Sequence, residues 1–258
     1  SASKLEDAQM AGLNRTLAGN WAVVTGGRVR VGHAIAIALA RLGMNLIITY
    51  RTAAAAAETT LAEFRAVGVR AHAFAVDLAD AKSVIDVADQ ILAQTGSSLR
   101  VLVNSASVYY ETPLGEISSA VWDTLLATNL RAPFLLSQRL GLAMKGTGGG
   151  HIVNIGDWAG IRPYRGYLPY LVSKAGLIYM TQAMALELSP EVQVNCVCPG
   201  AVLPPENTTV GEAAALRRET PLHRLGTPEE IAKAVRYFVE SEFTTGSVLM
   251  VDGGRLIA

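Results

Sequence analysis

Short apolar runs alternate with longer amphipathic segments along most of the chain. The apolar runs are rich in β-branched residues and nearly unbroken, as in "WAVVTGG" at 21–27, "MNLIITYR" at 44–51 and "VQVNCVCPG" at 192–200. Strands that are apolar on both faces are typical of a parallel sheet buried between two layers of helices. The strand and helix pattern repeats six times, which predicts an α/β fold with a doubly wound parallel sheet. Helices are expected near residues 118–145, 168–188 and 228–240.

The pattern indicates one domain. No linker or shift in composition divides residues 17–258, whereas residues 1–16 are expected to form a loose, flexible arm. One long stretch, about 201–227, is predicted to be irregular. Loops of that length are usually functional or disordered.

The composition is that of a folded chain without a strong charge preference. Hydrophobic residues make up 50 % and charged residues 17 %, with 22 basic and 22 acidic side chains. Such a chain is not disordered, and its balanced charge gives no general attraction for nucleic acid or anionic membranes. We therefore expect a small-molecule ligand. No apolar run has the length of a signal peptide or a membrane-spanning helix, so a cytoplasmic or equivalent reducing location is expected.

Cys196 and Cys198 lie two residues apart on a predicted strand. Their side chains then share one face, but an extended backbone holds them too far apart for an easy disulfide. Reduced core cysteines are the favoured interpretation, and a redox pair or half of a metal site is the alternative. We predict no metal site.

A glycine-rich turn follows the first predicted strand. In "TGGRVRVGHA", Thr25, Gly26 and Gly27 precede a helix, and Arg28 and Arg30 add positive charge. Glycines let a backbone approach a pyrophosphate closely, and a helix N-terminus offers unpaired N–H groups. A tight turn alone could also require glycine. Its place after the first strand of a repeating pattern favours a dinucleotide site.

Arg51 ends the second predicted strand, in "ITYR". Sites selective for NAD place an acidic residue there, which accepts a hydrogen bond from the ribose 2′-hydroxyl. A guanidinium suits a 2′-phosphate instead. The sequence therefore predicts NADPH, and a solvated surface arginine is the alternative.

A candidate proton-transfer group lies in "GDWAGIRPYRGYLPYLVSK" at 156–174. Tyr170 and Lys174 are one helical turn apart and share a face. A nearby ammonium favours the phenolate and should bring the pKa of the phenol closer to neutral pH. Asp157, thirteen residues before the tyrosine, is a candidate proton source, and a helix cap or a surface loop residue is the alternative.

Together these features resemble the short-chain dehydrogenases/reductases over residues 18–258. The marks of that family appear as "TGG" followed by Gly32, Asp77, "NSAS" at 104–107, Asn129, "YLVSK" at 170–174, "CPG" at 198–200 and "VDGG" at 251–254. The resemblance implies a Rossmann-type fold with a nicotinamide cofactor. It also implies that Tyr170 donates the proton, that Lys174 binds the nicotinamide ribose and lowers the tyrosine pKa, and that Asn129 holds a water in the proton relay.

The same resemblance implies a set of cofactor contacts. These are Thr25, Gly26, Gly27, Arg28, Arg30, Val31, Tyr50, Arg51, Asp77, Leu78, Asn104, Ser105, Ala106, Ser107, Tyr170, Lys174, Pro199, Gly200 and Val202.

Three departures from the family pattern point to one branch. Arg30 replaces the middle glycine of the nucleotide loop, "NSAS" replaces "NNAG", and Asp157 replaces the usual catalytic serine. These departures resemble the pteridine reductases and dihydromonapterin reductases. The branch implies that Ser107 contacts pterin and cofactor, and that Tyr109 stacks on the pterin ring where the branch typically has phenylalanine.

The predicted function is an NADPH-dependent reductase of a pterin, either a dihydropterin or an oxidised pterin, with dihydrofolate as a further candidate. Ser107, Tyr109, Asp157, Tyr170 and Leu203 are the predicted substrate contacts, with Pro204 as a second candidate beside Leu203. The alternatives are a carbonyl reductase acting on a sugar, steroid or acyl ketone, and a non-catalytic NADPH-sensing regulator. The resemblance further implies a homotetramer.

Overall fold

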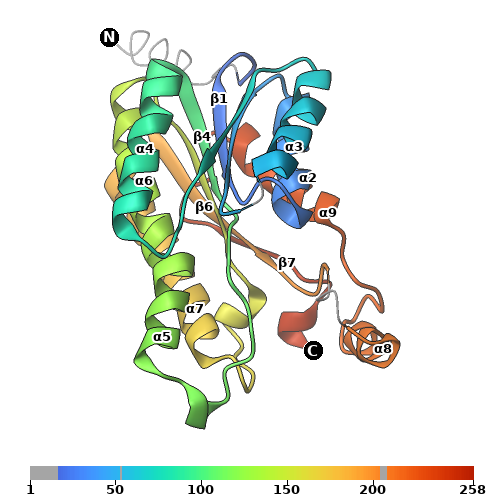
Figure 1. The fold of residues 1–258 in the computed structure, drawn as a ribbon. Coiled ribbons are helices and arrows are strands. Elements are labelled where there is room, and N and C mark those ends of the chain that lie inside the picture. Colours follow the sequence, from blue (N-terminus) through green and yellow to red (C-terminus); the bar gives the residue numbers. More distant parts are fainter. Residues whose placement is uncertain (1–16, 53, 204–207) are drawn as a thin grey trace, which may run out of the picture.

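The computed structural model describes residues 17–52, 54–203 and 208–258. Within these ranges seven parallel strands form one sheet in the order β3-β2-β1-β4-β5-β6-β7 (Figure 1). The strands are β1 (Trp21–Thr25), β2 (Asn45–Tyr50), β3 (Ala71–Ala75), β4 (Leu99–Asn104), β5 (Gly150–Ile155), β6 (Val192–Pro199) and β7 (Val248–Val251). The predicted arm at 1–16 and Pro204 lie outside the described residues.

Helices cover both faces of the sheet, so the predicted fold class is confirmed. Helices α2, α3 and α9 pack on one face, and α4, α6 and α7 on the other (Figure 1). The helices are α2 (Arg30–Arg41), α3 (Ala54–Ala66), α4 (Ala81–Thr95), α5 (Ser119–Leu126), α6 (Ala132–Gly146), α7 (Leu168–Leu188), α8 (Val210–Arg218) and α9 (Pro228–Glu240).

Both faces of the central strand β1 are covered by helices, which explains why its sequence is apolar at successive positions. All five of its residues are buried. Trp21 and Val23 pack into the layer that holds α4, α6 and α7, whereas Ala22 and Val24 pack into the opposite layer. Successive side chains of a strand point to opposite faces, and both faces here meet helices.

Two predicted segments differ from the structure. The helix expected near 118–145 is divided into α5 and α6 by a π-helical turn, Ala127–Arg131. The stretch 201–227, expected to be irregular, contains α8. This helix begins with a capping box, in which Thr209 and Glu212 satisfy each other's backbone N–H groups.

Cys196 and Cys198 are both buried and unbridged, with their sulfur atoms 3.7 Å apart. This agrees with the favoured interpretation as reduced core cysteines. Among the described helices, none combines the length and the hydrophobicity needed to cross a membrane.

Candidate active site

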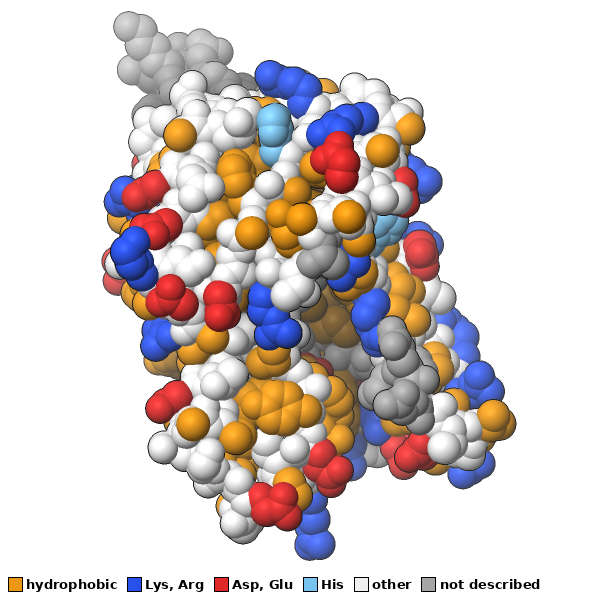
Figure 2. Space-filling view, in the orientation of Figure 1, with side chains coloured by type: hydrophobic (Ala, Val, Ile, Leu, Met, Phe, Trp, Pro, Cys, Tyr) orange, Lys and Arg blue, Asp and Glu red, His pale blue; other side chains and the backbone are white. Residues whose placement is uncertain are grey.

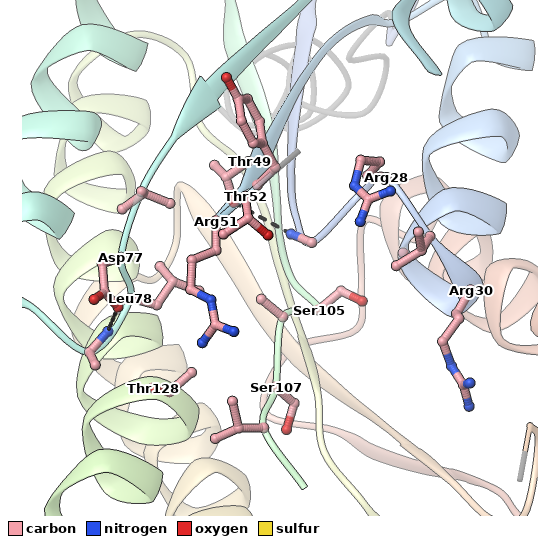
Figure 3. Close-up of a pocket in the computed structure, with 18 of the residues that line it drawn as sticks. Arg28, Arg30, Thr49, Arg51, Thr52, Asp77, Leu78, Ser105, Ser107 and Thr128 are labelled. Carbon is pink, nitrogen blue, oxygen red and sulfur yellow. Dashed lines mark hydrogen bonds between the residues drawn. The ribbon is translucent and has the colours of Figure 1, made fainter. Parts of the chain in front are cut away.

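A cleft of about 720 Å³ opens at the carboxyl ends of the first four strands (Figures 2 and 3). The chain turns in opposite directions from β1 to its two neighbours, β2 and β4, and such a switch point is where doubly wound sheets bind ligands. The lining residues come from the ends of β1 to β4 and the segments that follow them, together with Thr124 of α5 and Thr128 of the π-helical turn. They are Gly26, Arg28, Val29, Arg30, Val31, Gly32, Thr49, Tyr50, Arg51, Thr52, Val76, Asp77, Leu78, Ala79, Ser105, Ala106, Ser107, Val108, Thr124 and Thr128.

The glycine-rich turn is built for close approach. Gly26 has φ +65°, and a Cβ atom there would lie 3.1 Å from the Cα atom of Ala106. At Gly32 a Cβ atom would lie 2.4 Å from the carbonyl oxygen of Gly26. The Thr25 hydroxyl accepts hydrogen bonds from the backbone N–H groups of Ser105 (2.9 Å) and Ala106 (3.0 Å). The turn after β1 and the end of β4 therefore form one rigid edge of the cleft.

Two arginines that line the cleft suit an anionic ligand. Arg51 and Arg28 both line the cleft, and Figure 3 shows the Arg51 side chain extending into it from the end of β2. Neither guanidinium has a hydrogen-bond partner in the part of the chain that the structure describes. Asp77 is the acidic residue in the lining, and its carboxylate accepts from the backbone N–H of Ala79 at 2.9 Å. Positive charge therefore prevails beside the second strand.

Arg30 is held in a strained conformation. Its φ of 54° lies in the left-handed region, which costs a residue with a Cβ atom about 1–2 kcal/mol. Its guanidinium donates a hydrogen bond of 2.7 Å to the backbone carbonyl of Leu203. The side chain thus joins the nucleotide loop to the segment that follows β6.

Asp157 and Tyr170 meet across the end of β5. The Tyr170 hydroxyl donates to the Asp157 carboxylate at 2.6 Å, and the other carboxylate oxygen accepts from the Ala159 N–H at 2.8 Å. The alternative role as a helix cap is present, because Asp157 caps the short 3₁₀ turn Trp158–Gly160. Its role as a proton source stays a prediction, and the contact with the phenol is compatible with it. A phenol and a carboxylate joined by such a short hydrogen bond can share a proton or transfer it.

Lys174 is fully enclosed behind this pair. Its ammonium donates to the Ile155 carbonyl at 2.8 Å and lies 5.7 Å from the centre of the Tyr170 ring. Burial lowers the pKa of Lys174, and the nearby Asp157 opposes that shift. The side chain is therefore fixed by β5 as well as by its own helix.

The expected direction of the tyrosine pKa is wrong for this structure. Burial, together with the charge and hydrogen bond of Asp157, raises the pKa of Tyr170 well above its ordinary value instead of lowering it toward neutrality. Burial also raises the pKa of the Asp157 carboxyl, against the lowering effect of its bond with Tyr170. The phenol is accordingly protonated at neutral pH, and the carboxyl takes up a proton more readily than a solvated aspartate.

Asn129 lies in the π-helical turn between α5 and α6 and ties three segments together. Its side-chain oxygen accepts from the Val108 N–H (2.8 Å) and from the Ser107 hydroxyl (3.2 Å). Its amide donates to the Val108 carbonyl (2.9 Å) and to Ser173 (3.2 Å). Protein groups thus fill the hydrogen-bonding capacity of this side chain. The predicted water-holding role stays a prediction, and its contact with the water would have to come from the backbone.

An aromatic wall adjoins the pair. Tyr109 stacks on Tyr167 with ring centres 4.7 Å apart and an interplanar angle of 8°, and it meets Tyr170 edgewise at 4.8 Å. Tyr164 packs on Trp158 at 5.8 Å. At most one face of Tyr109 can therefore receive a ligand ring.

The wall ends at a cation. The guanidinium of Arg255 lies 5.0 Å above the Trp158 ring and forms an ion pair of 2.7 Å with Glu219, just after α8. The positive charge of Arg255 lowers the pKa of Asp157, but burial raises that pKa by more. Arg255, near the last described residue of the chain, is thus close enough to influence the pair formed by Asp157 and Tyr170.

Comparison with known proteins identifies the family of this chain. Residues 30–255 match the family model described as Enoyl-(Acyl carrier protein) reductase, a group of short-chain dehydrogenases. The 3-oxoacyl-[acyl-carrier-protein] reductase of Synechocystis is 33 % identical over 92 % of this chain and 96 % of its own. The chain belongs to the short-chain dehydrogenase/reductase family.

Solved structures of related proteins agree. A blue fluorescent protein from a metagenomic library, in complex with NADPH, superposes with a TM-score of 0.87 at 33 % identity, covering 93 % of this chain and 99 % of its own. FolM alternative dihydrofolate reductase 1 from Brucella canis, complexed with NADP, has a TM-score of 0.88 at 30 % identity, covering 95 % and 97 %. The chain is thus an oxidoreductase of the short-chain family with a single Rossmann-like domain.

Within this family fold, the predicted cofactor contacts separate into two groups. Those that line the cleft are Gly26, Arg28, Arg30, Val31, Tyr50, Arg51, Asp77, Leu78, Ser105, Ala106 and Ser107. Those outside its lining are Thr25, Gly27, Asn104, Tyr170, Lys174, Pro199, Gly200 and Val202. Asn104 is buried and donates to Ser137 (3.0 Å) and Asn154 (2.8 Å), so its described contacts hold β4 to β5 and α6.

Sequence reasoning missed several residues of the site. Thr49, Val76, Thr124 and Thr128 line the cleft, and Trp158, Tyr164, Tyr167 and Arg255 complete the wall. The density of aromatic residues in "DWAGIRPYRGYLPY" was the available signal for the wall. No local signal indicated Arg255.

Proposed function

We propose that this short-chain reductase uses NADPH to reduce a pterin, with Tyr170 and Asp157 as the proton-transfer pair. The observation that carries the proposal is the bond of 2.6 Å between the phenol and the carboxylate. A ketone reductase needs a neutral donor for a developing oxyanion, whereas an ionised carboxylate opposes negative charge. Reduction of a C=N bond requires a proton on nitrogen, which an acid can supply.

The cleft fits NADP(H) on three counts. Its volume of about 720 Å³ lies within the range of cofactor sites. Gly26 and Gly32 let the turn after β1 pack tightly against Ala106 and against the turn's own backbone, as glycine-rich nucleotide turns do, and the N-terminus of α2 that follows carries partial positive charge. Arg51 and Arg28 suit the 2′-phosphate. When bound, the cofactor supplies the hydride.

The chain's own groups then have distinct tasks. Lys174, fixed by the Ile155 carbonyl, holds positive charge beside the Tyr170 ring. Asp157 takes up a proton from solvent, because burial has raised its pKa. The Tyr170 hydroxyl, already hydrogen-bonded to that carboxyl, transfers a proton to the substrate nitrogen and is reprotonated by Asp157. The open face of Tyr109 provides an apolar surface for a planar ring.

A carbonyl reductase is the second candidate, because the Synechocystis relative is named a 3-oxoacyl-[acyl-carrier-protein] reductase. The FolM neighbour, which is named an alternative dihydrofolate reductase, favours a pterin substrate. NADPH oxidation should be measured with dihydrobiopterin, dihydromonapterin and dihydrofolate beside a 3-oxoacyl thioester and a panel of sugar and steroid ketones. Turnover of a ketone without any pterin would overturn the proposal, and NADPH binding without any turnover would favour the sensing regulator.

A homo-oligomer, as a tetramer, is part of the proposal. Helices α6 and α7 expose large apolar side chains on their outer surfaces: Phe134, Leu142, Leu168, Val172, Tyr179 and Leu186. Exposed apolar side chains at this density mark protein contacts. Light scattering coupled to size exclusion measures the mass, and Leu186→Glu with Tyr179→Glu should reduce it.

The two free cysteines, Cys196 and Cys198, suit the proposed reducing, cytoplasmic location.

A further inference from the structure

We propose that Arg30 is a positioning residue that couples cofactor binding to the substrate wall at Leu203. The inference rests on the proposed function for the identity of the two ligands. The coupling concerns a contact between two loops of this chain, which lie 173 positions apart in sequence.

Arg30 belongs to both parts of the site. It is the first residue of α2 and lines the cleft, at the helix N-terminus where a pyrophosphate binds. Its guanidinium also donates to the Leu203 carbonyl at 2.7 Å. Figure 3 shows it on the far side of the cleft from Arg51. A guanidinium carries five N–H donors in a planar fork, so one side chain can bind an acceptor on each of two loops.

The backbone of Arg30 indicates that the side chain has a function. A φ of 54° is readily adopted by glycine and disfavoured for any residue with a Cβ atom. Gly26, in the same loop, has φ +65°. An arginine in this position retains a strained backbone, and residues under such strain cluster at functional sites, which supports a functional role for the guanidinium.

The segment that precedes Leu203 is already anchored. The Gly200 N–H donates to the Val251 carbonyl at 3.0 Å, and the Gly226 N–H donates to the Ala201 carbonyl at 2.9 Å. Val202 is buried. The bond from Arg30 therefore fixes the next residue along the chain, and Leu203 is the proposed substrate contact. A phosphate that immobilises Arg30 lowers the entropy cost of holding Leu203 in place.

Coupling of this kind is reciprocal. If NADP⁺ raises the affinity for the pterin by some factor, the pterin raises the affinity for NADP⁺ by the same factor. Known couplings between sites are commonly about 5- to 150-fold, and we expect a factor of about 10 here.

The test begins with the cofactor alone. Amide hydrogen exchange is followed for the peptide that contains residues 201–203, with and without NADP⁺ at saturating concentration for each variant. In the wild type NADP⁺ should slow this exchange by about 10-fold. Arg30→Gly suits the left-handed backbone and should fold, yet it should abolish the NADP⁺-induced protection. Arg28→Ala, which removes a cleft cation with no contact to Leu203, should retain it.

The second measurement is the affinity of a dihydropterin with and without NADP⁺, by titration calorimetry. The coupling factor should fall to about 1 in Arg30→Gly and remain near 10 in Arg28→Ala. Arg30→Lys should keep cofactor affinity through its charge but lose most of the coupling, since it lacks the fork. Wild-type protection of residues 201–203 in Arg30→Gly would overturn the inference. If no pterin binds, the proposed function fails, while the exchange experiment still decides the role of Arg30.

Discussion

The cofactor cleft and the proposed catalytic group, which consists of Asp157, Tyr170 and Lys174, differ in how their polar side chains are bonded. In the cleft, Arg51 and Arg28 reach into open space, and no described residue hydrogen-bonds to either guanidinium. In the proposed catalytic group, Tyr170 and Lys174 are buried and Asp157 is half-buried, and each is hydrogen-bonded within the group or to β5. The cleft offers positively charged guanidinium groups to the negatively charged phosphates of the cofactor. The proposed catalytic group must instead hold its geometry and its proton affinity before the substrate binds.

The difference explains why burial matters for the chemistry. A solvated carboxyl has too low a pKa to hold a proton near neutrality, and burial raises that of Asp157. The cleft needs no such shift, because guanidinium groups stay charged in any of these surroundings. Substitutions in the two regions should accordingly affect turnover and cofactor preference separately.

The largest effect is expected from Tyr170→Phe. It keeps the ring and its packing on Tyr109 but removes the hydroxyl that donates to Asp157. Turnover should fall by about 10³- to 10⁴-fold, near the upper range for one acid–base group. NADPH affinity, measured by fluorescence titration, should be nearly unchanged. A parallel loss of cofactor affinity would show that the two regions are not separate.

Asp157→Ser should lower pterin reduction by about 10²- to 10³-fold. Because the carboxyl acts in its protonated form, the wild-type rate should fall as pH rises through its raised pKa, and the variant should lack that limb. Profiles of kcat/KM between pH 5 and 9 measure this. Asp157→Asn keeps the shape but cannot titrate and should also lack the limb. Wild-type rates in the serine variant would refute the proposed role of the acid.

Arg51→Asp should act on the other region. Charge-assisted bonds to a 2′-phosphate are worth roughly 1.5 to 3 kcal/mol each, so preference should shift toward NADH by about one to two orders of magnitude. The ratio of kcat/KM for NADPH and NADH measures it. Arg41→Asp, on the exposed end of α2 away from the cleft, makes the same charge change and should leave the ratio unaltered. Equal use of both cofactors by the wild type would contradict the role of Arg51.

Arg255→Met should give the smallest change. The charges and donors that face the Asp157 carboxyl are Tyr170, the Ala159 N–H, Lys174 and Arg255, and the last of these lowers its pKa. Removing that charge raises the pKa of Asp157 further, so the falling limb of the pH profile should move to higher pH. Arg255→Lys keeps the charge and should restore the wild-type profile. A limb that moves to lower pH would contradict the assigned direction.

The sequence by itself determined the elements whose signals are local. Helices at 168–188 and 228–240 were predicted at their observed boundaries, and the strands followed from apolar runs that need no partner to be recognised. Tyr170 and Lys174 share a helix, so a spacing of four residues was enough to place them together. Helix α8 was missed although "TTVGE" carries a capping-box signature, because its segment has little apolar periodicity.

Only the tertiary structure decided the contacts between distant segments. The Tyr109 and Tyr167 stack, the bond from Arg30 to Leu203, and the placement of Arg255 over Trp158 all depend on the order of strands in the sheet. The direction of the Tyr170 pKa also depended on the fold. Spacing showed a lysine nearby, but burial of the phenol and its contact with Asp157 raise the pKa of Tyr170, and both depend on the packing that only the folded chain creates.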